Sequence, residues 1–157
     1  MMLAEVEEII EEQIEEREMP SFNHSYICNR ILRQLFENDA IDALPELTLD
    51  IEKGVTPDIC VYPAQTIKPN FLRDYVRFPE MPILAIEVIS ASQNIQDLIE
   101  KARMLVSFGI KAVWTIEPFT NSIFVTTASG EKLFHNQAVE SEGITVDFRK
   151  IFTGYSE

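Results

Sequence analysis

Apolar residues recur along this chain with two different periods, which separate the expected helices from the expected strands. A helix repeats its buried face every three or four residues, and a strand does so every second residue. The helical period occurs three times, at about 1–18, 21–38 and 95–108. Gly109 directly follows the third segment and is a natural C-terminal cap. We therefore expect three helices.

The first expected strands form a hairpin. The segment 47–51 alternates strictly, 59–62 is apolar, and Lys53-Gly54 supplies a turn between them. The prolines and bases of 64–82 show little periodicity, so an irregular loop is expected there. The segment 83–89 is almost continuously apolar, which is typical of a central strand covered on both faces.

The expected helix at 95–108 connects two apolar strands. The second of them is 112–116, so strand, helix and strand should form a crossover unit with parallel strands. A second hairpin is predicted from 122–127 and 132–134, and a short last strand from 143–148. The predicted fold class is α/β (α+β), with a mixed β-sheet core flanked by helices.

Length and composition are typical of one folded domain. The chain has 157 residues, 46% of them hydrophobic, and we expect a single domain over residues 1–157. Cys28 and Cys60 do not form a C-x-x-C pair, so buried thiols are expected rather than a disulfide or a structural zinc site. No segment has the length of a membrane span or the pattern of a secretory signal, so a cytoplasmic protein without a membrane partner is expected.

The net charge of −13 excludes a uniformly basic nucleic-acid-binding protein. Residues 1–18 hold eight acids against Arg17, so much of the charge belongs to an acidic N-terminal helix whose acids should face water. The rest of the chain is still acidic, so contact with DNA would need a local group of bases. Two such groups are Lys68, Arg73 and Arg77, and Lys101, Arg103 and Lys111.

Glu87 is the most informative residue, because it is the one polar side chain in an apolar strand. A carboxylate buried alone is costly, so it needs a cation, a hydrogen-bond donor or access to water. Asp58 follows Pro57 at the start of the neighbouring expected strand, so both carboxylates could point at one spot. Two converging acids with a cation between them suit magnesium or manganese. The plainer alternatives are a turn acid for Asp58 and a strand-end carboxylate in water for Glu87.

Lys101 lies 14 residues after Glu87, in the helix that returns over the sheet. An ammonium group there could position an attacking water or offset charge that develops on a phosphate. Asp97 lies four residues earlier on the same helix face, so an ordinary helical ion pair is the alternative for Lys101.

Together these motifs resemble the Uma family of restriction-endonuclease-like proteins, a domain of unknown function within the PD-(D/E)XK nuclease superfamily. The resemblance spans most of the chain, and its residues are Thr56-Pro57-Asp58, Glu87-Val88-Ile89-Ser90, Asp97, Lys101, Gly109 and Trp114.

The resemblance implies a metal-dependent endonuclease that hydrolyses DNA phosphodiester bonds with magnesium or manganese. Asp58, Glu87 and the main-chain carbonyl of Val88 would hold the metal, and Lys101 would replace the strand lysine, whose position is Ile89. The auxiliary candidates are His24, Ser90 and Asp97.

The expected partners are DNA and a second copy of the chain in a homodimer. One alternative is a catalytically inactive nuclease-like protein that acts in binding. Another is an oligomeric interaction module that uses the acidic helix at 1–18.

Overall fold

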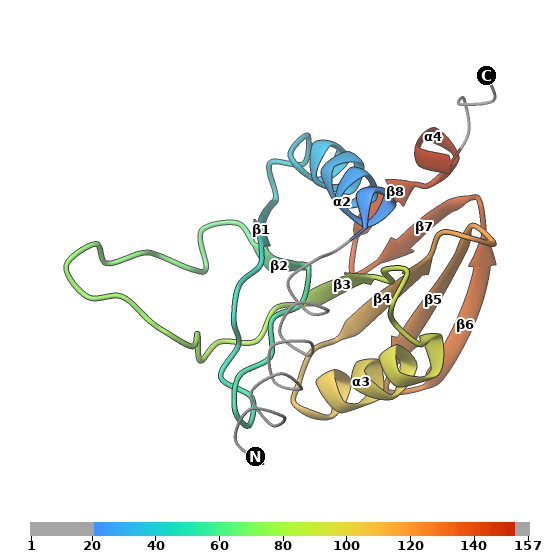
Figure 1. The fold of residues 1–157 in the computed structure, drawn as a ribbon. Helices are drawn as coiled ribbons and strands as arrows, with labels where there is room; N and C mark the ends of the chain where they lie inside the picture. Colours follow the sequence, from blue (N-terminus) through green and yellow to red (C-terminus); the bar gives the residue numbers. More distant parts are fainter. Residues whose placement is uncertain (1–20, 153–157) are drawn as a thin grey trace, which may run out of the picture.

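A computed structural model describes residues 21–152, which form a mixed sheet with helices on both faces (Figure 1). The expected helix at 1–18 lies outside the described residues. The sheet has the strand order β1-β2-β3-β4-β5-β6. Its strands are β1 (Ile41–Pro45), β2 (Ile59–Pro63), β3 (Leu84–Val88), β4 (Ala112–Glu117), β5 (Ser122–Thr127) and β6 (Gly130–His135). The remaining elements are the helices α2 (Phe22–Leu35), α3 (Ile95–Ser107) and α4 (Arg149–Phe152) and the two-stranded sheet of β7 (Ala138–Ser141) and β8 (Ile144–Asp147).

The β3–α3–β4 crossover is present as predicted. β3 and β4 pair in parallel, and the other paired strands of this sheet are antiparallel. Asn94 caps α3, since its side chain accepts a hydrogen bond from the Gln96 amide at 2.8 Å. The helix stops at Gly109, whose φ of 109° is unfavourable for other residues. This crossover packs α3 against β4 and β5 on one face of the sheet, next to β3.

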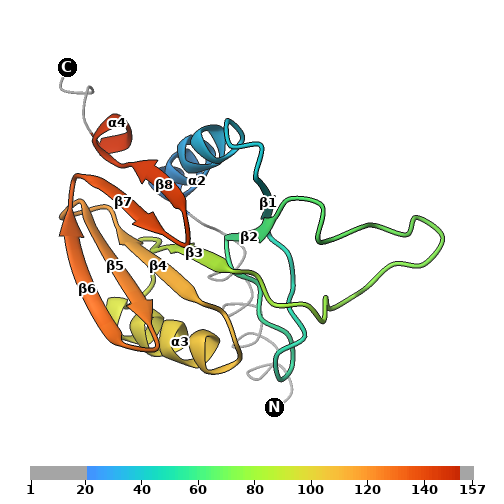
Figure 2. The same ribbon diagram turned by 180° about the vertical axis from the view of Figure 1, so that it is seen from behind.

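The two faces of the sheet bury separate apolar clusters. α2, α4 and the β7–β8 sheet cover one face, and α3 covers the other (Figures 1 and 2). Trp114, predicted to be a core anchor, is fully buried on the α2 face and donates its indole N–H to Ser141 Oγ at 2.8 Å. Both faces of β3 are therefore covered, as its apolar sequence predicts.

The prediction that 59–62 pairs with 47–51 in a hairpin is wrong. β2 pairs with β1, whereas 47–51 forms no strand and contributes only isolated bridges through Leu49. Leu49 and Ile51 are fully buried, so the alternation of 47–51 reflects burial of a loop rather than a strand ladder. β1 contains Asp, Ala and Pro, which have weak strand preference, and its Pro45 is tolerated because β1 is an edge strand.

The late strands follow the prediction more closely. The β5–β6 hairpin is confirmed, with Thr127 opposite Gly130. The predicted strand at 143–148 is β8, which pairs with β7, a strand that the sequence pattern did not reveal.

Residues 64–82, which we call the arm, form the predicted irregular loop. The arm leaves the end of β2, extends away from the sheet and returns to β3 (Figure 1). Phe71, Leu72 and Val76 near its tip are 94%, 95% and 93% exposed. Among the described residues, no helix is long and apolar enough to cross a membrane.

Gln34 joins α2 to the small sheet. Its side-chain Nε2 donates to the Asp147 carbonyl at 3.0 Å, and its Oε1 accepts from the Asp147 amide at 2.8 Å. Gln34→Ala removes both hydrogen bonds and should lower the free energy of unfolding by about 1–2 kcal/mol, measured by urea denaturation. Arg33→Ala, a change at an exposed neighbouring position, is the control. Equal stability of the two variants would show that this bridge does not anchor α2.

Candidate active site at the ends of β2 and β3

Glu87 is buried on the α3 face of the sheet. Leu84, Ile86 and Val88 of β3 belong to the α2-side cluster, so alternation turns Glu87 toward α3. Its residue surface is only 5% exposed. Lys101 of α3 places its Nζ 2.6 Å from Glu87 Oε1, because the crossover brings this helix over the end of β3.

Asp58 lies directly beside the end of β3. Ile59 is paired with Ile86, and continuing this antiparallel register by one residue sets Asp58 opposite Glu87. The Val88 amide donates to Asp58 Oδ2 at 2.7 Å, which fixes the carboxylate at this end of the sheet. The two acids singled out from the sequence are therefore neighbours at one end of β2 and β3.

His24 reaches the same place from the other side of the sheet. Ser21 caps α2 by accepting a hydrogen bond from the His24 amide at 3.3 Å, which puts His24 in the first turn of the helix. Its Nε2 lies 3.0 Å from Asp58 Oδ2. The hydrogen bond to Asp58 raises the pKa of His24, so the imidazole holds its proton more firmly than a free histidine does.

The positive charges near Glu87 do not fully offset the hydration that its carboxylate loses on burial. Burial raises its pKa to about 7, with a further increase from Asp58, while Lys101 and His24 act in the opposite direction. Among residues 21–152, Lys101 is the one cation paired with this carboxylate, and its charge does not fully offset the effect of burial on the pKa. A buried carboxylate that lies beside a second carboxylate and has one ammonium partner fits an additional hard divalent cation such as magnesium or manganese.

The remaining candidates lie near this centre without contacts that assign them a role. Ser90 follows β3 in a turn, where its amide donates to Gln93 Oε1 at 2.9 Å. Asp97 is exposed on α3, and the ion pairs formed within residues 21–152 do not include it. Lys101 is therefore paired with Glu87 rather than with Asp97. Val88 contacts Asp58 through its amide, and the role of its carbonyl remains a prediction.

Cys28 belongs to this centre, although the sequence analysis interpreted it only as a buried thiol. It lies one helical turn after His24, and ligand atoms of His24, Cys28 and Asp58 all lie within 4.8 Å of one another. Cys28 is half-buried, whereas Cys60 is fully buried. The spacing of four residues on an expected helix was the available signal, but the third member comes from a distant segment.

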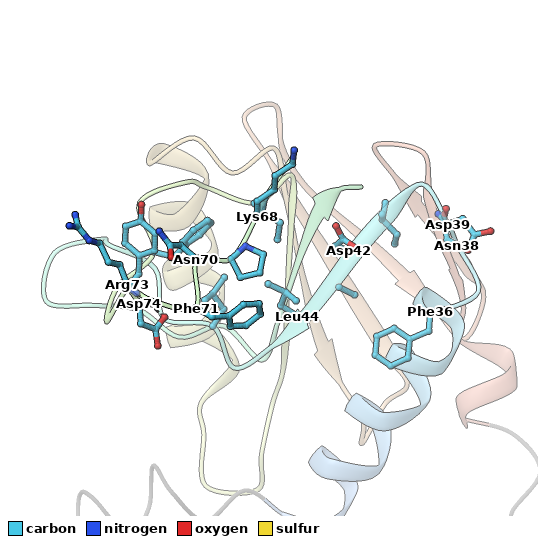
Figure 3. Close-up of a pocket in the computed structure, with 17 residues that line it drawn as sticks. Phe36, Asn38, Asp39, Asp42, Leu44, Lys68, Asn70, Phe71, Arg73 and Asp74 are labelled. Atoms are coloured by element: carbon cyan, nitrogen blue, oxygen red, sulfur yellow. Dashed lines mark hydrogen bonds between the residues drawn. The ribbon is translucent and has the colours of Figure 1, made fainter. Parts of the chain in front are cut away.

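A pocket of about 810 Å³ lies elsewhere (Figure 3). It lies between β1 and the arm, with Phe36 and Leu44 on one side and Lys68, Phe71 and Arg73 on the other. None of the candidate site residues lines it. Buried carboxylates and their partners, rather than pocket size, therefore identify the candidate centre.

Some of the bases that could contact DNA already form ion pairs or hydrogen bonds within the protein. Lys101 is paired with Glu87, and Arg103 with Glu131. Arg77 donates to the Glu52 carbonyl at 3.0 Å. Lys68 and Arg73 are exposed on the arm.

Comparison with known proteins identifies the family. The Uma2 family model, described as "Putative restriction endonuclease", matches residues 5–156. The chain therefore belongs to the Uma2 family, which confirms the resemblance inferred from the motifs. A comparison with curated proteins found no match.

The fold is that of a solved relative. A crystal structure of a "putative nuclease belonging to DUF820" from Anabaena variabilis ATCC 29413 superposes with a TM-score of 0.70 at 19% identity, covering 85% of this chain and 82% of the other. This likeness confirms the predicted restriction-endonuclease-like α+β fold. The cryo-EM structure of a DrdV–DNA complex matches at a TM-score of 0.44 and 12% identity, over 68% of this chain and 9% of the other. The fold assignment comes from the first of these structures.

The raised pKa of Glu87 predicts a pH-dependent stability of the metal-free protein. Between about pH 4.5 and about pH 7 the folded state holds a proton that the unfolded state releases, so the free energy of unfolding should fall as the pH rises. The pKa of His24 is raised above 6.5, so its deprotonation at higher pH should lower the free energy of unfolding further. Glu87→Gln should flatten the lower part of this dependence in urea titrations with a chelator present.

Glu100→Gln, which removes an exposed carboxylate of the same helix, should retain the wild-type slope. If Glu87→Gln also retains that slope, Glu87 ionises normally and the need for a cation disappears.

Proposed function

We propose that the chain is a magnesium- or manganese-dependent endonuclease that hydrolyses phosphodiester bonds in DNA. The observation that supports this most strongly is the buried Glu87 carboxylate, placed beside Asp58 and in contact with Lys101. Membership of the Uma2 family, described as "Putative restriction endonuclease", supports the substrate class. Both acids have main-chain or side-chain partners that hold them at one end of the sheet.

Asp58, Glu87 and the Val88 carbonyl would hold the divalent ion. When bound, such an ion supplies Lewis-acid charge to a phosphate and to the water that attacks it. Because Asp58 is fixed by the Val88 amide and Glu87 by a rigid strand, the two carboxylates need little rearrangement to act together.

Lys101 has a role that follows from its position. Its side chain is 29% exposed, and its Nζ lies 2.6 Å from Glu87 Oε1, so the residue contacts the buried carboxylate and is also open to solvent. In this position it can orient the attacking water or offset the negative charge that develops on the phosphate oxygens. Lys101 thus stands in for the strand lysine, since Ile89 occupies that strand position.

His24 would act as a positioning residue. Its Nε2 contacts the same Asp58 oxygen that accepts the Val88 amide, so it restricts the rotation of that carboxylate. The imidazole is 13% exposed, which limits its direct access to a substrate.

Substitution of the two acids tests the proposed chemistry. Asp58→Asn and Glu87→Gln keep the side-chain shape but remove the charge that binds the ion, so each should lower magnesium-dependent cleavage of plasmid DNA by at least about a hundredfold. Lys101→Met should lower the cleavage rate with less effect on metal affinity.

Glu100→Gln and Lys132→Met, both exposed, are the matched charge controls and should cleave like wild type. Wild-type cleavage by either acid variant rejects the assignment of the site. Metal binding without cleavage by the wild-type chain would favour the catalytically inactive alternative.

We also propose that the chain forms a homodimer through the arm. Three large apolar side chains, Phe71, Leu72 and Val76, are almost fully exposed, and such patches usually mark interaction surfaces. The arm holds three bases and two acids, whereas the whole chain has a net charge of −13, so attraction between the arm and a second copy favours this pairing.

The double substitution Leu72→Asp/Val76→Asp should convert the dimer into a monomer in sedimentation experiments, because it buries charge in the proposed interface. Phe119→Asp is the matched control, since Phe119 is 96% exposed but lies outside the arm. A wild-type monomer at micromolar concentration, or a dimer that withstands the double substitution, rules the arm out as the interface.

A further inference from the structure

A second set of metal ligands shares Asp58 with the proposed magnesium site. We propose that His24, Cys28 and Asp58 form a site for a thiophilic divalent ion, zinc above all, and that its occupancy excludes the ion used for cleavage. The exclusion rests on the proposed function, whereas the zinc site itself does not.

The geometry brings three ligand atoms together without rearrangement of the backbone. His24 and Cys28 are four residues apart on α2, so they lie on one face of the helix. Asp58 meets that face from the start of β2, with Oδ2 3.0 Å from His24 Nε2. One ligand atom from each residue lies within 4.8 Å of the others, so small side-chain movements would bring all three into bonding distance of a single ion.

The surroundings also favour a cation. The side chains of His24 and Asp58 are 13% and 20% exposed, so a bound ion would be largely shielded from water. Glu87 is nearby and adds negative charge from a buried carboxylate. His24 Nδ1 is buried without a hydrogen-bond partner among residues 21–152. This unsatisfied nitrogen is a second observation, independent of the ligand spacing.

The donor set selects the ion. A thiolate and an imidazole are poor ligands for magnesium, which prefers oxygen, whereas one sulfur, one nitrogen and one oxygen suit zinc and leave a fourth position for water. Binding would form a metal–sulfur bond, and the proton of the Cys28 thiol would pass to the buffer. No oxidant or reductant is needed.

Sharing of Asp58 makes the two sites antagonistic. Both sites would use the Asp58 carboxylate, whose Oδ2 already contacts His24 Nε2 and the Val88 amide, so we expect zinc to displace manganese from the oxygen site. Cys28 contributes to the zinc site but not to the proposed oxygen site, so its substitution separates the two.

Cobalt(II) reports on the proposed site directly, because a cobalt–thiolate bond gives an intense charge-transfer absorption in the near ultraviolet. The full chain should show this absorption on titration with cobalt chloride, and zinc should abolish it. Cys28→Ala should lose the absorption and bind zinc at least about tenfold more weakly in chelator competition. Cys60→Ala, at the other cysteine, should retain both properties.

Manganese displacement tests the antagonism. With manganese bound to the wild-type chain, added zinc should restore the electron paramagnetic resonance signal of free manganese, and Cys28→Ala should require at least about tenfold more zinc. An absent cobalt–thiolate absorption in the wild type, or its persistence in Cys28→Ala, overturns the zinc site. Failure of manganese to bind overturns the proposed nuclease function instead, and the cobalt result still decides this inference.

Discussion

The structure depends on one electrostatic constraint, the burial of the Glu87 carboxylate at the end of a central strand. Burial raises its pKa to about 7, which shows that the surrounding positive charge does not fully compensate for the lost hydration. Lys101 reaches it because the parallel β3–α3–β4 crossover returns α3 over the same end of the sheet. The register sets Asp58 opposite Glu87, because β2 is antiparallel to β3 and begins where β3 ends. The fold thus brings two acids and one base together at one end of the sheet.

The two helices give this centre two chemically different sides. α3 presents Lys101 to Glu87, whereas α2 presents His24 and Cys28 to Asp58. An oxygen-rich set and a set with sulfur and nitrogen therefore meet at a single carboxylate. Because hard and soft ions prefer different sets, the identity of the available metal would decide which side of Asp58 is used. The same carboxylate links the proposed catalysis to the proposed zinc site.

The elements that could be predicted from the sequence are those with a local signal in the hydrophobic period or the turn residues. The apolar run around Glu87, the cap at Gly109 and the crossover were all predictable from period and turn residues. The partner strand of β2 could not be predicted, because β1 has few strand-forming residues and its pairing depends on contacts distant in sequence. The proximity of Asp58 and Glu87 was predicted because the strands that carry them were expected to be adjacent, and β2 and β3 do pair. The participation of Cys28 required the packing of α2 against the start of β2, which no sequence period encodes.

The proposed chemistry requires that Asp58 and Glu87 share one divalent ion. Anomalous diffraction from a crystal of the wild-type chain soaked in manganese would test it most directly. An anomalous peak should lie within bonding distance of a carboxylate oxygen from each of the two residues. A peak bound to only one of them, or no peak at this end of the sheet at saturating manganese, would contradict it.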